Sequence, residues 1–141
     1  MAVTRRNGQG QYRRFRVPGK HILLIDDFKD NRDLYEFFLL QRGFRVTLAS
    51  TAQEALDKLF ELQPDLVVMD YSLPGMNGWD ATRRIKADER TKHIPVVMLS
   101  GYDLSSVARQ IGCEGFLVKP CLPDQLVAEI LRILAAGAMT S

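Results

Sequence analysis

Short apolar runs alternate with longer amphipathic segments from about residue 20 onward. Five of the runs are rich in aliphatic residues and are mostly apolar at successive positions, which is the pattern of strands buried on both faces. They are residues 21–25, 45–49, 66–69, 95–99 and 115–118. The chain is therefore expected to contain five strands, most of them apolar on both faces.

Apolar residues at helical spacing predict a helix after each strand, with its apolar stripe facing the sheet. The stripes are Leu34, Phe37 and Phe38; Ala52, Ala55, Leu56 and Leu59; Ala81, Thr82 and Ile85, in residues 79–87; Leu104, Val107, Ala108 and Ile111; and Val127, Ile130, Leu131 and Leu134. Ser50 with Gln53 is predicted to form a capping box, and Pro123 suits the first turn of the last helix.

Strict alternation of strands and helices predicts an α/β fold, a parallel sheet covered by helices on both faces. Right-handed crossovers place the carboxyl ends of all strands along one edge. For five strands we expect a doubly wound sheet of order 2-1-3-4-5. Ligands of such sheets bind at the switch point between the first and third strands.

Composition fits one globular domain of 141 residues in the cytoplasm. The sequence has no continuous apolar stretch of about 18 residues, so no membrane span is expected, and no signal peptide is apparent. Cys113 and Cys121 are too few for a disulfide framework and lack the spacing of a metal site.

Charge divides the chain into a basic arm and an acidic body. Residues 1–20 hold six bases and no acid, which leaves 13 bases and 17 acids for the rest. We predict a flexible arm over residues 1–18, one folded domain over residues 19–137 and a tail over residues 138–141. The arm could contact nucleic acid, but a solvated tail is the favoured interpretation, because charge alone specifies no partner.

Polar residues follow four of the predicted strands. They are Asp26 and Asp27, Asp70, Ser100, and Lys119. Carboxylates that meet at one edge raise one another's pKa unless a cation joins them, and hard oxygen ligands suit Mg²⁺. With the lysine and the hydroxyl nearby, Asp70 is placed to act as a nucleophile in phosphoryl transfer.

Residues 20 to about 136 resemble the receiver domain of two-component response regulators, which has a flavodoxin-like fold. The resemblance rests on four motifs in order: LLIDD, LVVMDYSLPGMNGW, VVMLSGY and GFLVKP. It implies that Asp70 accepts a phosphoryl group from a histidine kinase or a phosphotransfer protein. It also implies that Asp27 binds Mg²⁺ directly, that Asp26 binds it through water, and that Ser72 contributes its backbone carbonyl.

The resemblance further implies a switch in which phosphorylation moves Ser100 and Phe116, with output through an unidentified protein partner. A cis bond between Lys119 and Pro120 is usual in the family. The segment from Ser100 to Lys119 is about three residues shorter than in many receivers, so we expect a shortened fourth helix. We expect a stand-alone receiver that is no enzyme beyond its own phosphorylation and dephosphorylation.

Two alternatives stay open at this stage. One is a degenerate receiver that binds a partner regardless of phosphate. The other is a phosphatase or phosphotransferase with an aspartyl nucleophile. Enzymes that resemble haloacid dehalogenases carry a general acid two residues after the nucleophile, and this chain has Ser72 there. A nucleotide or flavin site is disfavoured, because the sequence has neither a Walker loop nor a G-x-G-x-x-G motif.

Overall fold

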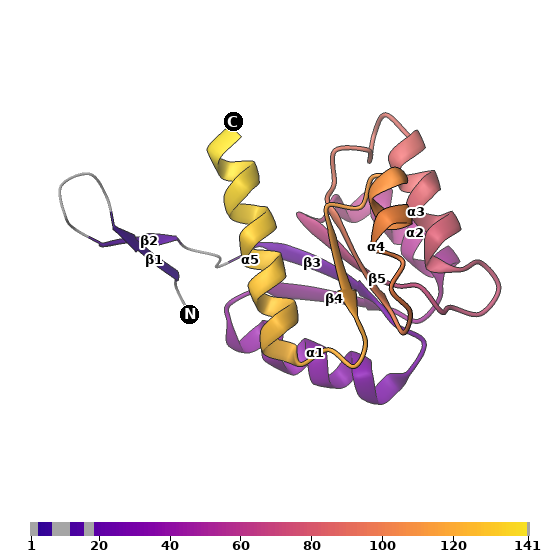
Figure 1. Ribbon diagram of the computed structural model, residues 1–141, viewed down its shortest axis with the longest axis horizontal. Coiled ribbons are helices and arrows are strands. Elements are labelled where there is room, and N and C mark those ends of the chain that lie inside the picture. The colour runs from indigo at the N-terminus through magenta and orange to yellow at the C-terminus, as the bar shows by residue number, and fades with distance from the viewer. Residues whose placement is uncertain (1–2, 7–11, 16–18, 141) are drawn as a thin grey trace.

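Five parallel strands form the central sheet of the protein (Figure 1). The structure, a computed structural model, describes residues 3–6, 12–15 and 19–140. The strands are β3 (His21–Ile25), β4 (Arg45–Ala49), β5 (Leu66–Asp70), β6 (Val96–Ser100) and β7 (Gly115–Val118). They lie in the order β4-β3-β5-β6-β7. When the five strands of this sheet are numbered 1 to 5 in chain order, their order in the sheet is 2-1-3-4-5, as predicted.

Helices cover both faces of the sheet, as predicted (Figure 1). One face carries α1 (Lys29–Gln41) and α5 (Pro123–Thr140), and the other carries α2 (Ala52–Leu62), α3 (Gly78–Ala87) and α4 (Ser105–Gln110). Helix α4 has only six residues, in agreement with the shortening expected between Ser100 and Lys119. Among the described residues, no helix is both long enough and apolar enough to cross a bilayer.

Alternating residues of the central strands build one core on each face. In β3 and β5, Ile22, Leu24, Leu66 and Val68 belong to the core under α1 and α5. Their neighbours Leu23, Ile25, Val67 and Met69 belong to the core under α2 and α3. All eight side chains are fully buried. The two faces of each strand are thus occupied by different helices, which explains why these strands read as continuous apolar runs.

The sheet-facing stripe predicted for α1 is wrong. The buried residues of this helix are Tyr35 and Leu39, whereas Leu34 and Phe37 are 46% and 56% exposed. The spacing of Leu34, Phe37 and Phe38 correctly marks an apolar stripe, but spacing alone does not say which stripe the sheet covers. Tyr35 and Leu39 form a second stripe one turn apart, and that one enters the core.

The capping box predicted before α2 is shifted by one residue. Thr51, not Ser50, is the N-cap, and its side chain accepts a hydrogen bond from the backbone N–H of Glu54. The Glu54 carboxylate accepts in return from the backbone N–H of Ser50. Gln53 donates to Asp57 on the helix surface instead. At the other end of the chain, Pro123 opens α5 as predicted.

Two strands precede the central sheet. Strands β1 (Val3–Arg6) and β2 (Tyr12–Phe15) pair antiparallel as a separate two-stranded sheet. The sequence did not predict them, because arginines interrupt both segments and no buried alternation is visible. Residues 7–11 and 16–18 lie outside the described residues. The flexibility of the arm and the division into residues 1–18, 19–137 and 138–141 stay predictions, and α5 continues to Thr140.

Candidate functional site

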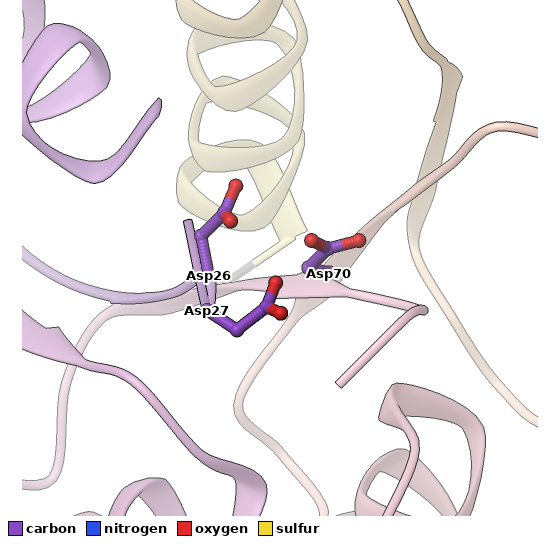
Figure 2. Close-up of side chains that lie close together, drawn as sticks. All are labelled: Asp26, Asp27 and Asp70. Carbon is purple, nitrogen blue, oxygen red and sulfur yellow. The ribbon is translucent and has the colours of Figure 1, made fainter. Parts of the chain in front are cut away.

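Three carboxylates meet at the carboxyl edge of the sheet. Asp26 and Asp27 follow β3, Asp70 ends β5, and the two strands pair directly, with Ile25 opposite Met69. Each of the three aspartates offers an oxygen that lies within 4.8 Å of the oxygens offered by the other two. Figure 2 shows the three side chains gathered at the strand ends. Asp26 and Asp70 are buried, and Asp27 is exposed.

Lys119 supplies a cation to the same place. It follows β7, and its ammonium group donates to Asp70 Oδ2 at 2.9 Å and lies 3.7 Å from Asp26 Oδ2. The Lys119 backbone N–H donates to the Ser100 carbonyl at 2.7 Å. The peptide bond to Pro120 is cis. The lysine thus reaches the acidic cluster across β6, which separates β7 from β5.

The remaining predicted residues lie around Asp70. Ser100 ends β6 beside the tip of β5; it is fully buried, and its hydroxyl oxygen accepts from the Tyr102 backbone N–H at 3.0 Å. The backbone N–H of Ser72 donates to Asp70 Oδ1 at 3.2 Å. Phe116 lies farther back, in the middle of β7 opposite Met98, and is half-buried. The structure therefore brings Ser100 and Ser72 to the acidic cluster but places Phe116 within the strand.

Burial shifts the pKa of the Asp70 carboxyl group. Removal from water raises the pKa of its carboxyl group, and the negative charge of Asp26 adds to that rise. The Lys119 ammonium group and the Ser72 backbone N–H act in the opposite direction. Burial has the larger effect, so the pKa lies above its usual value. A further cation near the cluster would favour the ionised, nucleophilic form.

The donor set fits a magnesium ion. Asp26 Oδ2 is a buried carboxylate oxygen that accepts no hydrogen bond from any described residue. Such an oxygen is costly to bury unless a cation compensates it. It lies in a group of three carboxylates, which are the hard oxygen ligands that Mg²⁺ prefers. The Lys119 ammonium group, 3.7 Å away, partly compensates the charge of this oxygen but is too far for a hydrogen bond, so the oxygen fits the role of a metal ligand.

Sequence reasoning missed three residues that shape the site. Gly78, eight residues after Asp70, packs directly against the Asp70 backbone. Arg32 donates through Nη1 to the Asp26 carbonyl at 2.7 Å. Tyr35 donates to the Cys121 carbonyl, two residues after Lys119. Arg32 and Tyr35 lie on the helix that begins just after Asp27. Their place in the first two turns of that helix was the sequence signal that could have identified them.

Comparisons with known proteins show which family the chain is similar to. The family model described as the response regulator receiver domain matches residues 22–131. The chain is 37% identical over 116 residues to the chemotaxis protein CheY of Pseudomonas aeruginosa, covering 79% of this chain and 94% of CheY. It is 33% identical over 119 residues to the phosphate regulon transcriptional regulatory protein PhoB of the same species. That match covers 82% of this chain but only 52% of PhoB, so the chain spans about half the length of that relative.

The fold is shared with solved receiver structures. A CheY-like receiver domain protein from Methanospirillum hungatei JF-1 superposes with a TM-score of 0.81 at 26% identity. The match covers 87% of this chain and 99% of that protein. The match of the family model over most of the chain, together with the CheY and PhoB relatives, shows that the chain belongs to the family of response regulator receiver domains.

Proposed function

We propose that Asp70 accepts a phosphoryl group from a histidine kinase or a phosphotransfer protein, and that this switches the binding of a downstream protein. The observation that carries the proposal is the arrangement around Asp70: a buried carboxylate in contact with the Lys119 ammonium and next to two further aspartates. Receiver domains are signalling switches of two-component systems, not enzymes acting on separate substrates. We expect this chain to catalyse only the transfer to and from its own aspartate, in the cytoplasm.

The transfer is a displacement at phosphorus. An oxygen of the ionised Asp70 carboxylate forms the new O–P bond while the P–N bond to the donor histidine breaks. The leaving imidazole keeps the electron pair of that bond and takes a proton from solvent. The equatorial oxygens gain negative charge in the transition state, and positioned cations stabilise it. Lys119 is one such cation, because its ammonium group already contacts Asp70 Oδ2.

Mg²⁺ is the second cation that we propose. Receiver domains bind this ion through an acidic pocket, and here Asp26, Asp27, Asp70 and the backbone carbonyl of Ser72 would hold it. When bound, the ion neutralises the carboxylates and the arriving phosphoryl oxygens. The Oδ2 of Asp26, which accepts no hydrogen bond from any described residue, supports this assignment. Asp27 is the exposed member of the three, which leaves one side of the cluster accessible to solvent and to a donor.

The switch is proposed to run through Ser100 and Phe116. The Ser100 hydroxyl oxygen accepts a hydrogen bond from the Tyr102 backbone. A phosphoryl group on Asp70 offers strong acceptor oxygens next to β6, and it would favour the conformer in which this hydroxyl donates to them. Because Phe116 lies on the adjacent strand β7, its ring would rearrange with Ser100 and alter the surface near α4 and α5.

An exposed apolar stripe on α1 supports a protein as the phosphoryl donor. Leu34, Phe37 and Leu40 recur every three residues on the outward side of the helix, and each is about half exposed. Phe28, which is 56% exposed, directly follows Asp27 at the start of α1. A donor protein must approach Asp70 at this edge of the sheet. The stripe runs along α1, the helix that follows Asp27, and offers such a donor an apolar surface.

Acetyl phosphate with Mg²⁺ tests the proposal without knowledge of the kinase. We expect the intact mass of the wild-type protein to increase by one phosphoryl group, and Asp70→Asn to prevent the increase. Asp57→Asn, which changes an exposed carboxylate on α2, should leave it intact. A wild-type protein that gains no mass would contradict the proposal and favour a receiver that acts regardless of phosphate. Steady release of phosphate from small phosphomonoesters would instead favour a phosphatase.

A protein donor tests the role of α1 separately. With a phosphorylated histidine kinase or phosphotransfer protein, Phe37→Ser should slow transfer to Asp70. The rate from acetyl phosphate should not change, because the small donor needs no apolar surface. Equal slowing with both donors would show that the substitution damages the site rather than the docking surface.

A further inference from the structure

A buried hydrogen bond joins α1 to the loop that carries Lys119. The Tyr35 hydroxyl donates to the Cys121 carbonyl at 2.9 Å, across 86 residues of sequence. We propose that Tyr35 is a positioning residue: by holding Cys121 it fixes the backbone that places the Lys119 ammonium group against Asp70. This inference rests on the proposed phosphoryl transfer and adds to it a residue that touches neither the phosphoryl group nor the metal ligands.

The loop after Lys119 has few other attachments. On its strand side, the Lys119 N–H is held by the Ser100 carbonyl. Pro120 has no N–H to donate, and the Leu122 N–H donates to Gln125 within the first turns of α5. Over residues 120–122, the bond from Tyr35 is the hydrogen bond that ties the described backbone to an element other than α5. The position of the loop relative to the acidic cluster therefore depends on α1.

Tyr35 is itself buried in the core. Its side chain is 5% exposed and packs in the core with Leu39, Cys121 and Leu126. Burial raises the pKa of its hydroxyl to about 12, and the charges of Asp26 and Asp70 contribute. The hydroxyl therefore keeps its proton and stays a donor throughout the physiological range. It is anchored between the Asp26 end of α1 and the loop that it holds.

Loss of the hydroxyl has a definite consequence for the lysine. Phenylalanine would fill the same space but leave the Cys121 carbonyl buried without this donor, so the loop would shift to find another partner. Lys119 lies two residues away, and its ammonium group must stay within hydrogen-bond distance of Asp70. Small displacements of a group that stabilises a transition state lower the rate sharply. The phosphorylation rate should thus report on the bond from Tyr35.

The test compares Tyr35→Phe with Thr91→Val in the full chain. Thr91 also donates a buried hydroxyl to a backbone carbonyl, that of Ile85, but it lies away from the site. Both variants should lower the melting temperature by similar amounts. Only Tyr35→Phe should slow phosphorylation by acetyl phosphate in saturating Mg²⁺, by roughly five- to tenfold, which corresponds to one buried hydrogen bond.

A double-mutant cycle separates positioning from general damage. In a Lys119→Ala background, Tyr35→Phe should change the phosphorylation rate by less than about twofold, because the group that it positions is gone. An equal effect in both backgrounds, or no effect in the wild-type background, would overturn the inference. If the wild-type protein itself takes up no phosphoryl group, the proposed function fails instead, which is a different result.

The lysine can also be observed directly. In metal-free protein labelled with ¹⁵N and ¹³C at its lysines, the side-chain Nζ signal of Lys119, assigned with Lys119→Arg, should be protected by its bond to Asp70. Tyr35→Phe should shift or broaden that signal, and Thr91→Val should not. An unchanged Lys119 signal in Tyr35→Phe would overturn the inference whatever the phosphorylation rates are.

Discussion

Gly78 lies against the backbone of Asp70 so closely that a β-carbon on Gly78 would stand 2.2 Å from the Asp70 carbonyl oxygen. The Gly78 N–H donates to the Tyr71 carbonyl at 2.9 Å, and the Gly78 carbonyl accepts from the Thr82 hydroxyl at 2.7 Å. The first residue of α3 is thereby fixed against the strand end that carries the proposed nucleophile. Glycine is required here for close approach, since no side chain fits between the helix and the strand.

Gly78→Ala should damage both stability and the site. The added methyl group must displace the Asp70 carbonyl or the start of α3, and overpacking of this kind costs about 1–3 kcal/mol of unfolding free energy. Chemical denaturation measures the loss, and acetyl phosphate labelling should show slower phosphorylation of whatever protein folds. Gly101→Ala is the control, because nothing lies within 4 Å of a β-carbon there. Equal stability of the two variants would show that α3 can move away from β5 freely.

Magnesium should stabilise the folded protein through the acidic cluster. The unfolded chain does not hold the three carboxylates together, so Mg²⁺ at ten times its Kd should add about 1.4 kcal/mol to the unfolding free energy. Asp26→Asn and Asp27→Asn should each reduce this gain. Asp30→Asn, which removes an exposed carboxylate on α1, should retain it. Thermal unfolding with and without Mg²⁺ measures the effect, and an equal gain in all variants would place the ion elsewhere.

Removal of the Asp70 charge should stabilise the metal-free protein at neutral pH. The folded-state pKa of Asp70 is raised above its ordinary value of 3.8, chiefly by burial. The folded state therefore binds this proton more tightly than the unfolded chain does, and stability is lost as the pH rises through the folded pKa. Asp70→Asn avoids that loss. In chelator, its melting temperature should exceed that of the wild type at pH 7, and the difference should shrink toward pH 3.8. A less stable variant at pH 7 would mean that the ion pair with Lys119 outweighs the cost of burial.

The fold could be predicted largely because the strands are buried on both faces. Runs such as residues 21–25 and 66–69 mark strands by themselves, and alternation with helices fixes a parallel sheet. The amphipathic pattern was less informative where a helix has two apolar stripes. On α1 the pattern identified Leu34 and Phe37, which are exposed. It missed Tyr35, which is buried, because tyrosine carries a polar hydroxyl and was not counted among the apolar residues.

Those residues of the candidate site that directly follow or end a strand could be predicted. Because parallel strands end at one edge, Asp26, Asp27, Asp70, Ser100 and Lys119 were placed together from their positions in the sequence alone. Gly78, which packs against the Asp70 backbone, and Tyr35, which we propose to position Lys119, were not identified. Their roles depend on a close approach of 2.2 Å and on a bond across 86 residues. Local sequence patterns contain no information about either.

His21 gives a pH dependence that is independent of the acidic cluster. It begins β3 at the opposite end from Asp26, is 8% exposed, and its Nε2 is hydrogen bonded to the Thr47 hydroxyl at 2.7 Å. Burial, with help from the charge of Arg45, lowers its pKa below 6.5, and the charge of Asp65 opposes this. The unfolded chain therefore takes up the proton at higher pH than the folded protein does. The stability contribution is present above about pH 6.5 and is lost as the pH falls through the folded pKa.

His21→Gln should remove this part of the pH dependence. Between pH 7.5 and pH 5, roughly the range over which histidine titrates, the unfolding free energy of the wild type should fall more steeply than that of the variant. His93→Gln, which makes the same change at an exposed position, is the control. Denaturant titrations at several pH values measure the three slopes. Parallel curves for the wild type and His21→Gln would show that the folded protein protonates His21 as readily as the unfolded chain does, and that the bond to Thr47 tolerates the charge.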